Sequence, residues 1–523
     1  MSKIASHVDE RDIKSLCEQI KKNNYIAPAD YEHFNIKRGL RNSDGTGVMA
    51  GITNVCTVEG YYIDDGEKIP REGHLYFRGY NMEDIVASCI EDDRFGFEEV
   101  IYLLLFGRLP SKDQLDNFCN ILAECRELPE DFIEDMIMKA PSPDIMNKLS
   151  RAVLCLYSYD DNPDDTSVEN VLRQCINLIA KIPAIMVYAY QVKRRHYYRK
   201  SMYIHPMKPE FRTAQTVLRS IRADKNFTDR EAKLLDICLM LHAEHGGGNN
   251  STFTTRVLTS SGTDTYAALA GGISSLKGPK HGGANIKVSE MVNHFKEGVS
   301  DITDEGQVAD FIRKIMKKEA GDGSGLIYGM GHAVYTLSDP RATILRSKAE
   351  EFAMGTEFEK EFKLLSTIEK LTPELFNEYK TTPKKAMCAN VDLYSGLVYK
   401  MLNIPPDLFT PIFTIARIAG WSAHRIEEIV SGGKIIFKHA LKNSLIPVVT
   451  YFGPMLAYIV TGSLVVEKIF AVPGVGRDFV NSITSRDYPL IMGTTIVLAS
   501  LIVIMNLITD FAYKLIDPRI SLE

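Results

Sequence analysis

The sequence lacks the features that mark small disulfide-bonded proteins, zinc proteins and strongly basic proteins. Its 523 residues include nine cysteines, all scattered singly, without a Cys-x-x-Cys pair or a zinc-ligand spacing. An odd, dispersed set of this kind is typical of free thiols in a reducing compartment. The formal charge of −6 argues against a dedicated nucleic-acid-binding protein. Hydrophobic residues at 45% and charged residues at 24% are ordinary for a globular chain.

Long charge-free runs are also missing from most of the chain and occur only near its end. Ser444–Val466 and Pro489–Thr509 contain no charged residue. Each reaches the roughly 20 residues that cross a hydrocarbon core of about 30 Å. The mean hydropathy of −0.10 therefore averages an acidic part and an apolar C-terminal part. The N-terminus is charged and has no apolar core, so we predict no secretory signal and a cytoplasmic location for the part before Gly432.

Periodicity predicts a mainly α protein with a small β region near the N-terminus. Gly45–Tyr80 is rich in Gly, Tyr, Ile and Val with short alternations, which indicates a β-hairpin. From Met82 to about Met240 apolar residues recur at three- and four-residue spacing, which indicates helices. Basic and aromatic residues interleave at Val192–Lys200. In an acidic chain we interpret that run as a solvated helix end, and we expect no nucleic-acid partner.

Segments that combine glycine with His, Asp or Arg are the candidates for chemistry. They are Leu241–Thr252, Leu276–Asn285, Gly329–Ala342, Asn390–Gly396 and, with the only tryptophan, Ile415–Trp421. Histidines among glycines offer neutral hydrogen-bond donors, and arginines offer forked donors suited to carboxylates. The set fits proton abstraction next to a carbonyl, followed by attack on the carbonyl of an anionic substrate. An aspartate of pKa about 3.9 is a weak base, so donors must stabilise the enolate.

Single residues in these segments also have simpler interpretations. His242 and His245 are three apart on an expected helix face and could form a metal pair. Spacing supplies no third ligand, so no metal site is predicted. Asp392 could be a simple helix N-cap. Spacing alone leaves these alternatives open.

Taken together and in this order, GPKHGGAN, GHAVY followed by DPRA, and NVDLYSG resemble the citrate synthase family. The resemblance runs from about residue 35 to 436. It implies a mainly α, two-domain homodimer, with residues 1–281 and 388–433 in a large domain and 282–387 in a small one. Closure of the small domain over oxaloacetate would create the acetyl-CoA site and exclude water. No cofactor would be bound permanently, because the coenzyme A thioester is a substrate.

The resemblance also implies a role for each motif residue. The catalytic set would be His281 on the enolate oxygen of acetyl-CoA, His332 on the oxaloacetate carbonyl, and Asp392 as the base that takes the methyl proton. The oxaloacetate carboxylates would be held by His245, Arg341 and Arg417. The coenzyme A moiety would lie near Gly329, Met330 and Gly331. The products would be citrate and CoA, and the motifs do not separate this activity from that of a 2-methylcitrate synthase acting on propionyl-CoA.

The C-terminal part departs from that family. Citrate synthases normally continue past Gly-Gly-Lys-Ile into an Arg-Pro tail, whose arginine binds a substrate carboxylate in the partner subunit. Here no Arg-Pro follows, and the next arginine is Arg477. Residues 434–523 instead resemble the end of a dipeptide/oligopeptide-type ABC transporter permease, with a transmembrane hairpin expected at 444–466 and 489–511. Lysines before the first run and after the second place both ends in the cytoplasm, so this tail would span the plasma membrane.

Three hypotheses follow from this combination. The chain is an enzyme with a membrane tail, a permease component, or an inactive chimera of synthase and permease. The enzyme is favoured, because the synthase motifs are complete while two spans cannot enclose a transport pathway. The abrupt change of family near Lys434–Phe437 indicates two joined gene fragments. Loss of the tail arginine would cost about 1.5–3 kcal/mol of substrate binding.

Overall fold

The computed structural model describes residues 52–64, 67–278, 281–379, 386–431 and 474–516. These residues form two compact units, one ending at Ile429 and the other beginning at Val430. The expected first membrane span, 444–466, lies outside the described residues, as does the start of the family resemblance before residue 52.

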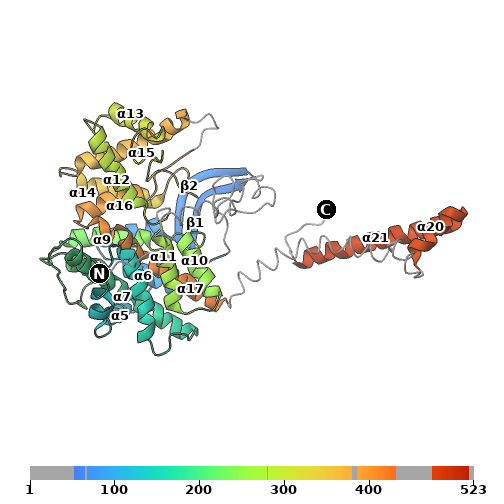
Figure 1. Cartoon of the computed structure of the whole chain (residues 1–523), viewed down its shortest axis with the longest axis horizontal. Coiled ribbons are helices and arrows are strands. Elements are labelled where there is room, and N and C mark those ends of the chain that lie inside the picture. Colours follow the sequence, from blue (N-terminus) through green and yellow to red (C-terminus); the bar gives the residue numbers. More distant parts are fainter. Residues whose placement is uncertain (1–51, 65–66, 279–280, 380–385, 432–473, 517–523) are drawn as a thin grey trace, which may run out of the picture. The chain divides into compact units, whose positions relative to one another are not determined.

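The first unit is mainly helical, as predicted (Figure 1). Its strands are β1 (Cys56–Asp64), β2 (Glu67–Phe77) and β3 (Tyr80–Asn81). Its helices up to the expected small domain are α3 (Met82–Glu91), α4 (Phe97–Phe106), α5 (Lys112–Glu124), η1 (Ile133–Met138), α6 (Ile145–Leu156), η2 (Tyr157–Tyr159), α7 (Val168–His196), α8 (Thr213–Ile221), α9 (Asp229–His242), α10 (Asn250–Ser260) and α11 (Thr265–Leu276). The later ones are α12 (Ala284–Gly298), α13 (Glu305–Met316), α14 (Pro340–Ala353), α15 (Glu359–Tyr379), α16 (Asp392–Met401), η3 (Pro406–Leu408) and α17 (Phe409–Val430).

The predicted β-hairpin is confirmed as a small antiparallel sheet of order β1-β2-β3. Glu59 lies opposite His74, and Tyr61 lies opposite Pro70. Between these two pairs, Gly60 alone faces the residues 71–73, so β2 carries a bulge there. Leu75 and Phe77 alternate inward on β2 and are fully buried.

The long helix α7 runs through the core of the first unit. Among the helices that the structure describes, it alone is long and apolar enough to cross a membrane, and 83% of its most apolar stretch is buried within the protein. Burial of this kind identifies a core helix. Ser167 caps its start by accepting a hydrogen bond from the N–H of Asn170. The basic run at Val192–Lys200 is the end of this helix and the residues that follow it, as predicted.

A second group of helices, α12 to α16, packs together apart from α7 and α17 (Figure 1). Contacts join α13 to α15, α14 to α16, and α12 to α16. The group begins where the small domain was expected to begin, and α16 packs with it beyond residue 387. The domain boundaries themselves stay predictions.

Helix ends carry the predicted functional segments. α9 ends at His242, three residues before His245, and α16 begins at Asp392. α14 begins at Pro340, directly before Arg341, and Asp339 caps it through its side chain. Helix ends leave backbone groups without intrahelical partners, so side chains and ligands gather there.

The second unit contains α20 (Val475–Ser485) and α21 (Tyr488–Ile516). α21 covers the second expected membrane span, 489–511. Several of its large apolar side chains are exposed, and they include Tyr488, Met492, Ile496 and Val503. Its apolar stretch within the described residues, Tyr488–Val497, is too short on its own to cross a membrane, so the second expected span stays a prediction.

Candidate active site

Two histidines and a tyrosine form a cluster of rings at the predicted site. The ring centroids of His245 and His332 lie 5.0 Å apart, edge to face. Tyr335 stacks on His332 at 4.7 Å and meets His245 edge-on at 5.5 Å. Tyr335 is buried, whereas both histidines are half-buried. The fold therefore joins the segment after α9 to the segment before α14.

Backbone donors fix the tautomer of His332. The N–H groups of Val334 and Tyr335 both donate to its Nδ1, at 3.1 and 3.0 Å. An imidazole nitrogen that accepts hydrogen bonds carries a lone pair and no proton. The neutral ring therefore has its proton on Nε2, which becomes a donor.

His245 is held in the neutral state. Burial, and then the positive charge of Arg341, lower its pKa well below the usual value. Its Nε2 is a buried polar atom without a hydrogen-bond partner among the described residues. Such atoms are uncommon in folded proteins and suit a position that receives a polar ligand.

Arg341 is paired with a carboxylate from its own segment. Its Nε and Nη2 donate to the two oxygens of Asp339 at 3.0 and 2.8 Å, which is a bidentate pair. Both residues are buried. Burial lowers the pKa of Arg341, but the Asp339 carboxylate outweighs it and the pKa is raised. Arg341 is therefore a permanent, oriented cation.

Arg417 supplies a second buried cation from the middle of α17. Its Nε donates to the carbonyl of His242 at 2.8 Å, and its guanidinium lies 4.7 Å from the ring centroid of Phe413. Burial lowers its pKa to about 10, against the opposite effect of Glu244. The side chain is thus charged at neutral pH. Glu244 is itself 3.1 Å from Nε2 of His424, and both are fully buried.

Asp392 lies among these charges at the start of α16. The residue preceding the helix is Val391, and no side chain caps it, so the interpretation of Asp392 as a simple N-cap is wrong. Instead Asn390 accepts the N–H of Asp392 at 3.0 Å through its side chain. Burial raises the pKa of Asp392 to about 6, although Arg341 lowers it. A carboxylate with this pKa is a stronger base than an ordinary aspartate.

His281 lies in the segment between α11 and α12 and is connected to α17 through Ser251 and Trp421. Its Nε2 lies 2.8 Å from Oγ of Ser251. Ser251 donates to Asn249 at 2.9 Å and accepts from the indole N–H of Trp421 at 3.2 Å. Trp421 lies one helical turn beyond Arg417 on α17, so one helix supports both positions.

The predicted coenzyme A segment pairs with residues 388–390, directly before Asp392. Gly329 and Gly331 have φ values of +84° and +87°, a conformation that favours glycine. Gly331 donates to the carbonyl of Cys388 at 2.7 Å, and Asn390 donates to the carbonyl of Gly329 at 2.9 Å. Met330 pairs across the same bridge and is half-buried. These bonds tie the segment that carries His332 to the segment that carries Asp392.

The shared helix face that spacing suggested for His242 and His245 does not form. α9 ends at His242, so His245 lies beyond the helix and the two do not share a helix face. In the described ranges, no group of three or more His, Cys, Asp and Glu side chains is arranged to hold a metal ion. Both histidines instead face the cluster of arginines described above.

Sequence reasoning missed several supporting residues, namely Glu244, Ser251, Tyr335 and Asp339. Asp339 could have been found, because it precedes Arg341 by two residues. A carboxylate in that position can cap the helix and form an ion pair with the arginine at the same time. Glu244 stands between two histidines in a polar segment. Ser251 and Tyr335 gave no signal, because their contacts with His281 and His245 join residues that are distant in the sequence.

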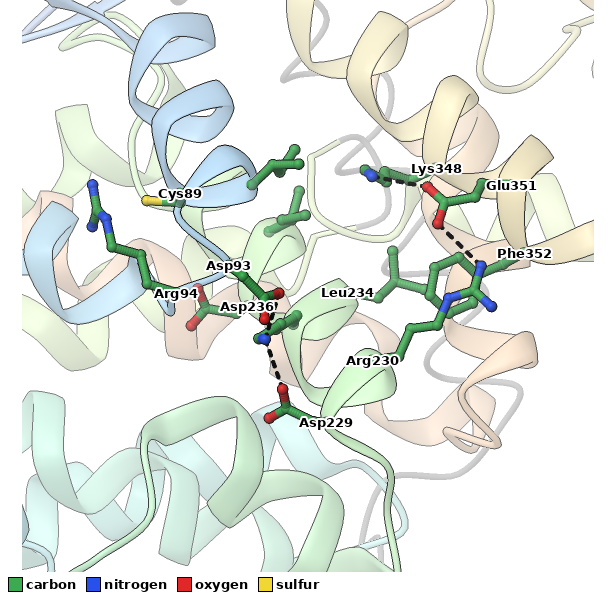
Figure 2. Close-up of a pocket in the computed structure, with 13 residues that line it drawn as sticks. Cys89, Asp93, Arg94, Asp229, Arg230, Leu234, Asp236, Lys348, Glu351 and Phe352 are labelled. Carbon is green, nitrogen blue, oxygen red and sulfur yellow. Dashed lines mark hydrogen bonds and ion pairs between the residues drawn. The ribbon is translucent and has the colours of Figure 1, made fainter.

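A separate cavity of about 290 Å³ lies between α3, α9 and α14 (Figure 2). Arg230 of α9 pairs with Glu351 of α14 at 3.0 Å and lies 4.1 Å from the ring centroid of Phe352. Lys233 pairs with Asp93 at 2.6 Å on the opposite side. None of the predicted site residues lines this cavity. We interpret it as a gap bridged by ion pairs between two helical groups.

Comparison with known proteins agrees with this geometry. Residues 44–437 match the family described as citrate synthase, C-terminal domain. Citrate synthase of Synechocystis is 32% identical over 411 residues, which cover 78% of this chain and 90% of that protein. 2-Methylcitrate synthase 1 of Corynebacterium glutamicum is 31% identical over 401 residues, covering 76% and 93%.

Solved citrate synthase structures are also similar to this chain, and its C-terminal segment matches a second family. A Thermoplasma acidophilum citrate synthase in ternary complex with carboxymethyl coenzyme A and oxaloacetate superposes with a TM-score of 0.60 at 25% identity, covering 74% of this chain and 92% of that one. Thermotoga maritima citrate synthase gives 0.58 at 26% identity, covering 74% and 91%. Residues 430–522 match the inner membrane component of binding-protein-dependent transport systems. The chain therefore belongs to the citrate synthase family and ends in a segment that matches a transport-system membrane component.

Proposed function

We propose that this chain condenses acetyl-CoA with oxaloacetate and, with water, releases citrate and CoA. The observation that carries the proposal is the convergence of two buried cations, two neutral histidines and one carboxyl of raised pKa on a single site. These groups are Arg341, Arg417, His245, His332 and Asp392. Oxaloacetate is a dianion with a central carbonyl, and the site offers charges and donors in that combination.

Oxaloacetate would bind first, with its carboxylates on Arg341, Arg417 and His245. Arg341 keeps its orientation because Asp339 holds two of its donors. His332 would donate from Nε2 to the carbonyl oxygen, since its Nδ1 is occupied by backbone N–H groups. That hydrogen bond makes the carbonyl carbon more electrophilic.

Enolisation of the thioester would use Asp392 and His281. Asp392 removes a methyl proton of acetyl-CoA, and its pKa of about 6 brings it nearer to working pH. His281 is held at Nε2 by Ser251. It would donate from Nδ1 to the developing enolate oxygen once the hydroxyl proton of Ser251 turns from Asn249 to Nε2, which leaves the ring proton on Nδ1. The enolate carbon then attacks the oxaloacetate carbonyl carbon to form citryl-CoA. Water hydrolyses that thioester to citrate and CoA.

Closure of the small domain and a homodimer are also part of the proposed function. The helices α12 to α16 would close over oxaloacetate and complete the coenzyme A site at Gly329, Met330 and Gly331, as in enzymes that assemble their site by closure. A homodimer through the synthase part is also proposed, as the family resemblance implies. No permanently bound cofactor is required for these steps.

A thiol-release assay tests the proposed reaction. The full chain in detergent is supplied with oxaloacetate and either acetyl-CoA or propionyl-CoA, with Asp392→Asn as the matched control. We expect thiol release with acetyl-CoA that depends on oxaloacetate and is lost in the control. Faster release with propionyl-CoA would instead assign a 2-methylcitrate synthase. Absence of release with both thioesters would support the inactive chimera.

A role for the C-terminal segment is proposed separately. We infer that residues 434–523 anchor a cytoplasmic enzyme in the plasma membrane through a hairpin at 444–466 and 489–511. The exposed apolar side chains of α21 favour this, because an exposed apolar surface of this kind suits contact with lipid or a partner. Transport by this segment alone is disfavoured, since a hairpin cannot enclose a pathway.

A further inference from the structure

The segment that carries His332 is clamped by the β1–β2 hairpin. The hydroxyl of Tyr335 donates to the carbonyl of His74 on β2 at 3.3 Å. The backbone N–H of Gly73 donates to Oγ of Ser338 at 3.0 Å, and Ser338 donates to Glu72. Strand β2 thus holds this segment both at Tyr335 and three residues later.

The clamp depends on two glycines that allow very close backbone approach. A Cβ at Gly60 would lie 2.6 Å from the carbonyl oxygen of Val334, and one at Gly73 would lie 2.2 Å from that of Ser338. Both distances are shorter than contacts to real Cβ atoms, so neither site admits a side chain without displacement. Both glycines lie where the β1–β2 register shifts, next to the bulge. Bulges are frequent beside active sites, where they redirect the chain.

Tyr335 connects the clamped segment to the two histidines, because its ring contacts both of theirs. Its side chain is 1% exposed, so the ring has no room to turn away. One face stacks on His332 with an interplanar angle of 26°, and the ring meets His245 at 76°. Its backbone N–H is also one of the two donors to Nδ1 of His332. One residue therefore contributes to both the ring plane and the tautomer of His332.

We propose that Tyr335 is a positioning residue for His332, and that the bulged β1–β2 hairpin is the element that holds Tyr335 in place. The hairpin would then be part of the catalytic apparatus although none of the predicted site residues lies on it. This inference rests on the proposed function for its kinetic readout. A misplacement of about 1 Å in such a site can lower the rate about 100-fold, which sets the scale of the expected effect.

Four variants of the full chain in detergent separate positioning from folding. Tyr335→Leu removes the aromatic ring, and Tyr335→Phe retains the ring but removes the bond to His74. Gly60→Ala displaces Val334 by direct contact from the hairpin and leaves Tyr335 itself unchanged. Gly79→Ala is the matched control, because Gly79 has a φ of +89° close to the same sheet but no atom within 4 Å of its Cβ position. Thermal unfolding is measured for each variant.

We expect Tyr335→Leu and Gly60→Ala to lower kcat about 10- to 100-fold, with the KM for acetyl-CoA changed less than about threefold. Tyr335→Phe should recover most of the loss and stay within about threefold of the parent kcat. Gly79→Ala should lower the unfolding temperature without a comparable loss of kcat. A Tyr335→Leu protein with kcat within threefold of the parent would overturn the proposal, as would equal losses in Gly60→Ala and Gly79→Ala.

A second measurement keeps this inference distinct from the proposed reaction. If the parent chain releases no thiol, the proposed reaction fails, and the ¹⁵N NMR spectrum of ¹⁵N-histidine-labelled protein still tests the positioning of His332. The signal is assigned by its loss in His332→Gln. Tyr335→Leu and Gly60→Ala should move its Nδ1 shift, and Gly79→Ala should not. An unchanged His332 signal in the first two variants would overturn the inference whatever the activity.

Discussion

Asp392 shows how position alone changes the chemistry of a side chain. In the unfolded chain it would be an ordinary aspartate, with a pKa near 3.8. Burial at the start of α16 raises that pKa to about 6. The raised pKa favours proton abstraction and also opposes folding, because ionisation is easier in the unfolded state.

Replacement of Asp392 by Asn should therefore abolish thiol release and stabilise the fold. The folded pKa lies above the unfolded one, so the destabilisation is absent below about pH 4 and complete above about pH 6. The shift of roughly two units corresponds to about 3 kcal/mol. Urea unfolding of parent and variant at pH 4 and pH 7.5 checks this. Equal stability differences at both pH values would contradict it.

The pH dependence of the reaction follows from the same carboxyl. The base acts only when ionised, so log kcat/KM for acetyl-CoA should rise with pH up to about 6 and then level off. Arg417, with a pKa of about 10, stays charged across this range. Initial rates between pH 4.5 and 8.5 at saturating oxaloacetate give the profile. An acidic limb with its midpoint near pH 4 would indicate that Asp392 is not the base or is not buried in the working state.

At the scale of elements, the site is assembled from segments that lie far apart in the chain. Arg341 and Asp392 lie at the starts of α14 and α16, Arg417 lies in the middle of α17, and His245 follows the end of α9. Short backbone bridges join the segment of Gly329 to that of Asn390. At the bridge between Gly329 and Asn390 the backbone also approaches the start of α16 closely, because a Cβ at Gly329 would lie 2.9 Å from Cα of Leu393. Leu393 is next to Asp392 and fully buried.

Gly329→Ala should therefore damage both the loop and the start of α16. Gly355→Ala is the control, since Gly355 has a φ of +74° but open space around its Cβ position. The control should lose only about 1 kcal/mol from left-handed backbone strain. Gly329→Ala should lose several-fold more stability and at least about 10-fold in kcat. Chemical unfolding and thiol release compare the two, and equal losses would show that the close approach to Leu393 is unimportant.

At the scale of the whole molecule, the chain combines a segment that matches an enzyme family with a segment that matches a family of membrane components. The family match to citrate synthase ends at residue 437, and the membrane-component match begins at residue 430, with no linker between them. The second expected span coincides with α21, and the first lies outside the described residues. Truncation near Gly433 would therefore separate the synthase part from the proposed membrane anchor.

Truncation after Gly433 should release the protein from membranes without restoring full activity. The family resemblance implies a tail arginine that this chain lacks, and its absence would remain in the truncated form. Grafting an Arg-Pro tail after Gly433 should raise kcat/KM for oxaloacetate about 10- to 100-fold, the equivalent of about 1.5–3 kcal/mol. Sedimentation with membranes and thiol release measure the two effects. Equal activity of truncated and grafted forms would contradict the role of that arginine.

Much of the protein could be predicted because its information is local in the sequence. Periodicity gave the mainly helical fold and the N-terminal hairpin, and both are confirmed. Motif order gave the family, which the comparisons also find. The helix assignments near the site were less accurate: α9 ends before His245, and Asp392 is not a cap. Helix ends depend on a few capping contacts, so spacing alone places them poorly.

The sequence by itself determined which side chains are available for the reaction, and that an apolar tail of different origin follows them. Only the tertiary structure decided how those side chains behave. The tautomer of His332, the raised pKa of Asp392 and the bidentate pairing of Arg341 each require a specific geometry around the group. The clamp of β2 on Tyr335 joins residues far apart in the chain. Such properties come from burial and from contacts that folding creates, so composition and residue spacing alone do not predict them.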